Sequence, residues 1–378
     1  MTDQDVRDFL ERMAAEEPIP FIDAEPLTLR ARRRAARTVV VGAVGVAAAI
    51  AVLFAGASQL LEASPNVPAI DPTPTPTPVA SGALAYALDG DIYVAHPDGT
   101  NEVKIADGGI PDGGCEGIGV YSLPSWSPDG RYLAFQRDCP GLEQADVLIT
   151  DPTGNVVAEG PSYGWGFTWS PDSTRVAVWK TLHTFGVYGV DGERQALPLP
   201  PVTGGGNDAA PEWMPDGSAL LVFGYAVVPL DGSAGYELSH IREYSPDGTR
   251  VAVVEGRSIT VLDASGSPVS DVDAPLDGVE AWSPDGDRFA SLFHDELTVV
   301  DVASGTVTVL TEARDALDGD HMILGVHGFS PQGDRILYDT GSETGDRIVA
   351  TALWSIGADG SDPRLLVAGT IQGDWRPR

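Results

Sequence analysis

A five-residue motif recurs six times between Trp126 and Gly333, and each copy places an aromatic residue before a Ser-Pro-Asp-Gly-like turn. Successive aromatic residues lie 43, 44, 31, 38 and 47 positions apart. A spacing of roughly 40 residues suits one four-stranded blade of a β-propeller, whereas helical repeats of this length would show apolar residues at a 3.6-residue period. The copies begin at Trp126, Trp169, Trp213, Tyr244, Trp282 and Phe329.

The residue types in each copy predict a tight hairpin between two strands. Serine accepts local hydrogen bonds, proline presets φ near about −65°, aspartate tolerates the third position, and glycine relieves the exit. A second group of Asp/Gly turns follows the next apolar run in each repeat, so every repeat holds two turns on one face of the disc. These second turns are Pro97 to Gly99, Asp151 to Gly154, Asp191-Gly192, Asp231-Gly232, Asp263 to Gly266, Asp301 to Gly305 and Asp359-Gly360.

The two ends of the repeat region account for one more blade. Gly82 to Ala106 supplies three outer strands without an innermost one, and Ile371 to Arg378 resembles a lone innermost strand. Pairing of these two segments would close the ring and remove its exposed sheet edges. The sequence therefore predicts an all-β, seven-bladed β-propeller with a composite closing blade over residues 82–378. The aromatic residues of the six motifs, together with Trp375, are expected to pack blade against blade.

The Trp-Ser-Pro-Asp-Gly pattern resembles the WD40-like (PD40) repeats of TolB-type propellers, which also precede prolyl-oligopeptidase-type hydrolases. The resemblance covers residues 82–378 and departs from the pattern at Ser173, Met214 and Gln332. It implies a propeller that serves as a binding platform, an assembly factor or an accessory domain. No hydrolase domain follows Arg378 in this sequence, so we expect no peptidase activity.

The segment Thr38–Leu61 holds 24 residues without a charge, enough for a helix to cross a bilayer of about 30 Å. Five arginines between Arg30 and Arg37 precede it, which predicts a cytoplasmic N-terminus and an extracytoplasmic propeller on a single-pass cell-membrane protein. A signal-peptidase site at Ala55-Gly56-Ala57 is the alternative, and we favour a retained anchor because the preceding segment is long for a signal peptide. Residues 62–81 are rich in proline and threonine and are expected to form an extended linker.

Residues 1–37 form a predicted cytoplasmic tail. Thr2 and Asp5 resemble a capping box, and Val6, Phe9, Leu10 and Met13 recur at helical spacing, so a short amphipathic helix is expected. This helix is either a surface for a cytoplasmic regulator or a membrane-proximal segment without a specific role. The order of helix, span and outer domain is similar to that of membrane-anchored anti-sigma factors, although residues 1–62 contain no His or Cys for the zinc-binding form.

Charge narrows the partners of the outer part. Beyond Arg37 the chain has 16 basic and 47 acidic residues, a net charge of −31. Such a field repels nucleic acid and anionic headgroups, so both are poor partners for the propeller. A cationic ligand or a basic protein patch is favoured, while an acidic surface that serves only solubility remains the alternative.

Cys115 and Cys139 are the only cysteines in the chain. An extracytoplasmic location permits oxidation, and folding about the turn at Pro128-Asp129 would bring the two positions to the same rim. We therefore predict a disulfide between them. A metal-binding or nucleophilic cysteine is disfavoured because there is no CxxC motif.

A search for catalytic groups gives no convincing constellation. Gly160 to Gly164 matches G-x-S-x-G, but a nucleophile elbow needs a following helix, and Ser162 is interpreted as a loop residue. The run Asp315 to His321 could hold a weak divalent cation, yet a solvated acidic loop is favoured. The sequence thus predicts a protein that is not an enzyme, with no cofactor and no metal.

Binding residues are expected on the opposite face, where the connections vary in length. Tyr163, Trp165, His321 and His327 are the candidate binding residues, because aromatic and imidazole groups combine contact area with polar tips. The favoured function is a membrane-tethered, non-catalytic platform that binds a protein or a cell-envelope ligand. The alternative is a transmembrane signalling protein with the layout of an anti-sigma factor, whose propeller is the outer sensor.

Overall fold

The structure is a computed structural model that describes fourteen stretches of the chain, from Gly82 to Pro377, and the predicted N-terminal tail, membrane helix and linker lie outside them. No helix occurs among the described residues, and none there could therefore cross a bilayer. The predicted disulfide between Cys115 and Cys139 also lies outside the described residues. The described stretches are 82–108, 120–138, 145–163, 166–181, 184–198, 210–238, 240–256, 258–272, 276, 278–293, 296–310, 321–344, 347–370 and 372–377.

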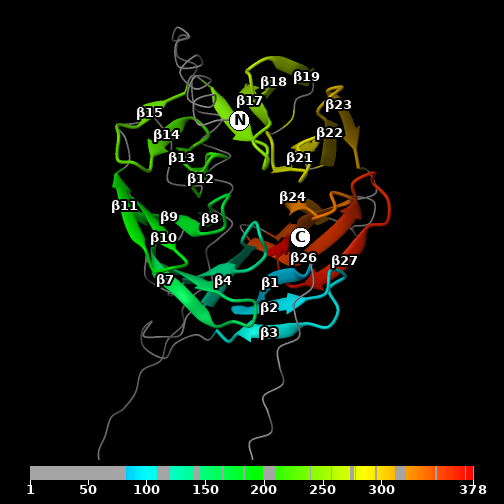
Figure 1. Cartoon of the computed structure of the whole chain (residues 1–378). Coiled ribbons are helices and arrows are strands. Elements are labelled where there is room, and N and C mark those ends of the chain that lie inside the picture. The colour runs from blue at the N-terminus through cyan, green and yellow to red at the C-terminus, as the bar shows by residue number, and fades with distance from the viewer. Residues whose placement is uncertain are drawn as a thin grey trace, which may run out of the picture.

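The described strands form seven four-stranded antiparallel sheets around a common centre (Figure 1). From the innermost strand outward, blade A contains β28 (Gly373–Trp375), β1 (Leu84–Leu88), β2 (Asp91–Ala95) and β3 (Val103–Ala106). Blade B contains β4 (Val120–Trp126), β5 (Leu133–Asp138), β6 (Ala145–Thr150) and β7 (Val156–Ser162). Blade C contains β8 (Phe167–Trp169), β9 (Arg175–Thr181), β10 (Thr184–Gly189) and β11 (Arg194–Pro198).

The remaining four copies of the motif build blades D to G in the same order. Blade D contains β12 (Glu212–Trp213), β13 (Ala219–Val222), β14 (Ala226–Pro229) and β15 (Tyr236–Glu237). Blade E contains β16 (Ile241–Tyr244), β17 (Arg250–Glu255), β18 (Ser258–Asp263) and β19 (Pro268–Val272). Blade F contains β20 (Ala281–Trp282), β21 (Arg288–Phe293), β22 (Glu296–Asp301) and β23 (Thr306–Val309). Blade G contains β24 (His321–Phe329), β25 (Arg335–Thr344), β26 (Arg347–Gly357) and β27 (Arg364–Ala368).

Blade A joins the two ends of the described chain. Strand β28 pairs antiparallel with β1, and Trp375 lies opposite Leu84. Two backbone bonds extend this pairing beyond the strands, because Gly82 N–H donates to Arg376 O at 2.8 Å and Arg376 N–H donates to Ala83 O at 2.8 Å. The predicted seven-bladed propeller and its composite closing blade are both confirmed.

The direction of the strands gives the disc two different faces. The turns that join first to second strands and third to fourth strands lie together on one face, which we call the turn face. The other connections lie on the opposite face, which we call the loop face. Gly82 and Arg376 meet at the turn face, since β28 ends and β1 begins there.

The serine of each motif organises its turn. Ser127 is fully buried, its hydroxyl donates to Asp129 Oδ1 at 2.8 Å, and it accepts from Tyr132 N–H at 3.0 Å. Ser170, Ser245 and Ser283 repeat both contacts with the corresponding residues of their own turns. Side-chain hydrogen bonds of this kind hold a turn in one conformation before any blade packing occurs.

The departures from the motif are each accommodated. Ser330 donates to Asp334 at 2.7 Å, two positions after Gln332, so the turn keeps a carboxylate partner. Met214 is buried in place of serine, while its N–H still donates to Ala219 O at 3.0 Å. Ser173 adopts the left-handed conformation expected of glycine, with φ of 62°, and its hydroxyl accepts from Asp129 N–H in the preceding blade.

The motif aromatics pack between neighbouring blades, as the sequence predicts. Trp169 Nε1 donates to Ser125 O in the preceding blade at 3.0 Å, and Trp213 Nε1 donates to Thr168 O at 3.1 Å. Of the six motif aromatics and Trp375, four are buried and three are half-buried, and the hydrophobic clusters that surround them combine residues of adjacent sheets. The core of the molecule is therefore a set of interfaces between blades.

In blades B, C and F the residue five positions after the motif serine covers the aromatic of the next blade. Tyr132 stacks on Trp169 with ring centroids 6.3 Å apart, and Arg175 lies 4.9 Å from the ring centroid of Trp213. The guanidinium of Arg288 likewise lies 5.6 Å from the ring centroid of Phe329 in blade G. Cation–π and aromatic contacts of this kind contribute about 0.5–2 kcal/mol each. We call these contacts the stacking row.

Replacing Arg288 with alanine is expected to lower the free energy of unfolding by about 1–2 kcal/mol. The variant loses the stacking on Phe329 and the bond from Arg288 Nη2 to Gly333 O, which is 2.7 Å long. Chemical denaturation measures the loss. Arg250→Ala is the matched control, because Arg250 occupies the same position and donates to Thr249 O of its own turn. Equal losses in the two variants would contradict a stabilising role for the stacking row.

Candidate functional site

The structure places the four candidate binding residues differently. Tyr163 directly follows β7 and lies half-buried at the loop face, whereas Trp165 lies outside the described residues. His327 lies on β24, the inner strand of blade G. His321 was expected at the end of an acidic loop, and that expectation is wrong: its backbone begins β24 and pairs with Ser342.

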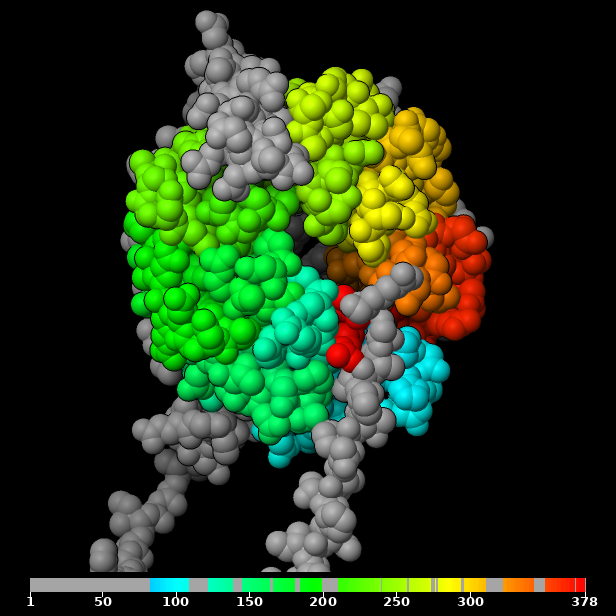
Figure 2. Space-filling view, viewed as in Figure 1, coloured from blue at the N-terminus to red at the C-terminus, as the bar shows by residue number. Residues whose placement is uncertain are grey.

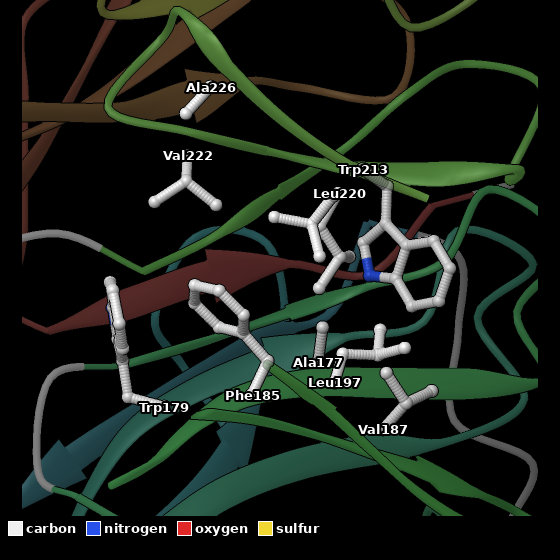
Figure 3. Close-up of a cluster of buried hydrophobic side chains, with 10 residues drawn as sticks. Ala177, Trp179, Phe185, Val187, Leu197, Trp213, Leu220, Val222 and Ala226 are labelled. Atoms are coloured by element: carbon white, nitrogen blue, oxygen red, sulfur yellow. The ribbon is translucent and has the colours of Figure 1, made fainter. Parts of the chain in front are cut away.

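Tyr163 belongs to an aromatic cluster between blades C and D. Its N–H donates to Trp179 O at 2.7 Å, and its side chain packs against the buried cluster that contains Trp179 and Phe185. Figure 3 shows these two rings side by side at one end of the cluster, with Trp213 at the other end and aliphatic side chains between them. Phe223 and Tyr225 extend the cluster outward and are half-buried. We call Tyr163, Phe223 and Tyr225 the aromatic patch.

Phe223 sits in an unfavourable backbone conformation. The turn between β13 and β14 places Phe223 at a φ of 58° and Gly224 at 73°, and Tyr225 N–H donates to Val222 O at 3.2 Å. These values define a type I′ turn, in which asparagine or glycine is preferred at both central positions. The ring is held by contacts to Trp179 and Tyr225, with centroid distances of 6.0 and 6.1 Å. Strained backbone conformations cluster at functional sites, so Phe223 marks the aromatic patch as a candidate binding site.

Phe223→Asn separates a structural role of this side chain from a binding role. Asparagine suits the left-handed position, so the free energy of unfolding is expected to change by less than about 1 kcal/mol despite the lost ring contacts. Phe185→Ala, which removes a fully buried ring of the same cluster, should cost about 3–5 kcal/mol. Denaturant titration measures both variants. A loss above about 2 kcal/mol for Phe223→Asn would show that the ring is needed for packing.

The inner wall of the ring is irregular where the closing strand lies. Strand β28 contacts β4 and β24, which are longer than the other inner strands and carry bulges. In the bulge of β4, Leu123 adopts a φ of 52°, and its N–H donates to Gln372 Oε1 at 2.8 Å. Bulges re-aim side chains and are over-represented next to functional sites. Figure 2 shows the hollow at the centre of the ring, with the C-terminal residues in red beside it.

A polar cluster occupies this part of the wall. Asp374 Oδ2 accepts from Trp126 N–H at 2.8 Å and from Ser125 Oγ at 3.1 Å. Enclosure by protein raises the pKa of Asp374 to about 6, although these hydrogen bonds and the charge of His327 lower it. His327 Nε2 lies 3.2 Å from Oδ1 of the buried Asp339. We call Asp374, His327, Asp339 and Ser125 the closure cluster.

Sequence reasoning found only His327 of this cluster. Asp339 and Asp374 lie 12 and 47 positions further along the chain, and no local motif links them to the histidine. The sequence offered one indication of Asp374: the predicted closing strand would place this residue beside the inner strands of blades B and G. Blade G itself brings His327 and Asp339 together, and the closing strand adds Asp374.

The arrangement of these groups does not match a nucleophilic site. The Ser125 hydroxyl donates to Asp374 at 3.1 Å, whereas the base of an activated serine is itself held in orientation by a third group. Ser162 is also not a loop residue as expected, because it ends β7, is buried and accepts from Gln136 Nε2 at 3.1 Å. No group of three or more metal-ligating side chains occurs in the described part of the chain. The absence of catalysis remains a prediction.

A groove of about 570 Å³ lies at the rim between blades B and C. The exposed Val156 and Val157 of β7 line it, but the outer edge of this strand is covered. Arg194 Nη2 donates to Glu159 O at 2.8 Å and the Tyr188 hydroxyl donates to Pro161 O at 2.7 Å. Pro161 itself offers no N–H, so most of the edge is closed to pairing with another strand.

Comparison with solved structures finds proteins of similar fold at low sequence identity. A functionally unknown protein from Desulfotomaculum acetoxidans is 12% identical with a TM-score of 0.51, and the match covers 79% of this chain and 100% of that one. The β-propeller domain of the Trilobed protease from Pyrococcus furiosus is 16% identical over 76% of this chain and 94% of that one, with a TM-score of 0.48. A protein assigned as TolB from Agrobacterium tumefaciens is 18% identical over 59% and 94%, with a TM-score of 0.39. No family model and no curated protein sequence matches the chain.

Proposed function

We propose that this protein is a membrane-tethered, extracytoplasmic propeller that binds a protein or cell-envelope ligand at its loop face without chemistry of its own. The observation that carries the proposal is the position of the chain ends. Gly82, where the linker joins the propeller, is bonded to Arg376 at the turn face. A linker that leaves from this face presents the loop face away from its point of attachment.

The contrast between the two faces supports the assignment of binding to the loop face. The turn face is built from repeated tight turns whose polar side chains are occupied by local hydrogen bonds. The loop face carries the aromatic patch, whose three side chains are half-buried. Partly exposed aromatic side chains on a rigid scaffold are enriched in protein-binding sites.

The negative charge of the turn face fits an arrangement in which this face points toward the membrane but stays at a distance from it. Hydrogen bonds from the turn residues lower the pKa of Asp263, Asp285, Asp301 and Asp359, so these carboxylates stay ionised in mildly acidic solution. Ionised carboxylates on this face are repelled by an anionic bilayer surface. Together with the proline-rich linker, this repulsion would hold the propeller at a distance from the membrane.

The binding proposal is tested with variants of the two faces. Full-length protein is cross-linked in cell envelopes, purified and compared by mass spectrometry with a loop-face variant, Tyr163→Ser combined with Phe223→Asn and Tyr225→Ser. The loop-face variant is expected to lose at least about 90% of specific partners, a change of about 1.4 kcal/mol or more in binding free energy. The matched turn-face variant, Thr249→Ala combined with Ser265→Ala and Ser361→Ala, should keep them.

Partner recovery that depends on the turn face would contradict the proposal, provided that both variants fold as judged by thermal unfolding. Protease accessibility in intact cells tests the location, and the propeller is expected to be cleaved from outside. Deletion of residues 1–37 examines the signalling alternative. Loss of a cytoplasmic regulator with this deletion would make a transmembrane sensor of anti-sigma-factor-like layout the better description.

A further inference from the structure

The outermost strand of each blade has one edge without a partner strand in its own sheet. Charged residues and prolines commonly protect such edges against pairing with another chain. Six of the seven outer strands carry residues of this kind, namely Lys104 in β3, Glu159 and Pro161 in β7, Arg194 and Pro198 in β11, Glu237 in β15, Pro268 and Asp271 in β19, and Arg364 in β27. Strand β23 of blade F is the exception, because its sequence is Thr-Val-Thr-Val.

Packing also covers several of the protected edges. At three places the turn before the outer strand of one blade meets the outer strand of the preceding blade. The glycine of the turn comes so close that a Cβ would lie 2.6 Å or less from a backbone oxygen of that strand. These pairs are Gly154 with Ile105, Gly305 with Asp271, and Gly99 with Leu366. The edges of β3, β19 and β27 are therefore closed by contact as well as by sequence.

The register of β23 directs backbone groups outward. Leu310 N–H donates to Leu297 O at 2.8 Å, and bonded pairs alternate along an antiparallel ladder, so Thr308 also directs its backbone groups toward β22. Val307 and Val309 then direct their N–H and C=O groups away from the sheet. No hydrogen bond between described residues reaches these outward groups.

The side chains of β23 suit an additional strand. Thr306, Thr308 and Val309 are exposed, and Val307 is half-buried. All four residues are β-branched, a side-chain type that favours the extended conformation and packs well against cross-strand neighbours. Figure 1 shows β23 at the circumference of the ring, on the outer side of β22. Among the described outer strands, β23 thus combines outward backbone groups with a sequence that lacks protection.

The charge around this edge selects its partner. Asp301 lies opposite Thr306 at one end of the strand pair, and hydrogen bonds from Ser304 lower the pKa of its carboxyl. At the other end, the ten residues that follow Leu310 contain four acidic residues and one arginine. An acidic setting of this kind favours basic residues in a partner. It disfavours a second copy of the chain, which would bring like charges together.

We propose that β23 is a protein-binding surface that takes an extended segment of a partner protein as a fifth strand of blade F. The backbone of the segment would pair with Val307 and Val309, and basic residues at its ends would meet the acidic groups. In such recognition the main-chain hydrogen bonds provide affinity and the side chains provide selectivity. This rim surface is separate from the aromatic patch between blades C and D, so its test is independent of the loop-face proposal.

Defined peptides test the surface by fluorescence anisotropy with the full-length protein in detergent. The probe is a labelled Lys-Val-Thr-Val-Thr-Val-Lys peptide. The charge-reversed peptide, with glutamate at both ends, is expected to bind at least about tenfold more weakly. The lysine peptide with every internal amide N-methylated cannot donate to the edge and should also bind at least about tenfold more weakly. Equal affinity of either control peptide would contradict the proposal.

Val309→Pro removes one outward N–H and leaves the ladder to β22 intact. The affinity for the lysine peptide should fall about fivefold or more, the effect of one lost backbone hydrogen bond. Val309→Thr is the matched control, because it keeps the N–H and the branched shape, and its affinity should stay within about twofold of the wild-type value. Equal affinities of the two variants would show that the peptide binds elsewhere on the acidic surface.

Two further variants cover the case in which Val309→Pro does not fold. Thr308→Lys places a repelling charge on the exposed edge and Thr308→Glu an attracting one, so the lysine peptide should bind at least about threefold more weakly to the first. The proposal is overturned if the two variants bind it equally, or if the wild-type protein does not bind it at about 1 mM. Dimerisation in analytical ultracentrifugation that Thr308→Lys and Thr308→Glu both abolish would identify a second copy as the occupant and would also overturn it.

Discussion

The contact between each blade and the next is the constraint on which this structure depends. A four-stranded sheet with two apolar faces has no stable position in water alone, so every blade must bury both faces against its neighbours. The tryptophan bonds to the preceding blade and the stacking row toward the next blade set the spacing of these interfaces. Because each blade needs two neighbours, the ring must close. Loss of the closing strand would leave blade A incomplete and expose the apolar faces beside it.

At the closure an arginine also covers the aromatic residue of the next blade, but this arginine comes from the C-terminal tail. Arg376 covers Trp126 with a distance of 5.4 Å between guanidinium carbon and ring centroid, and its Nε bonds Gly130 O. In blades C and F the covering arginine comes from the start of the second strand, whereas here it follows the innermost strand. A contact that the repeats supply elsewhere is thus rebuilt by the C-terminal tail, which explains why the ring can be formed from two distant chain ends.

The sequence predicted the blades because their turns are local. Serine, proline, aspartate and glycine set a hairpin within a few residues, so their recurrence counts blades without knowledge of any long-range contact. The expectation that Trp375 belongs to a closing strand followed from the same count. Ser162 and His321 were assigned to loops because strand ends depend on pairing with a neighbour, which local composition reveals poorly.

The candidate site was less predictable, since both of its parts are made by contacts between blades. Tyr163 could be selected for its position after a strand, but the strain at Phe223 depends on the φ of one turn residue, and a phenylalanine gives no sign of a left-handed backbone. The closure cluster required the pairing of β28 with β1 before Asp374 could be placed near His327. Once that pairing is known, an enclosed carboxyl between two inner strands is a necessary consequence of a closing strand that carries an aspartate before its tryptophan.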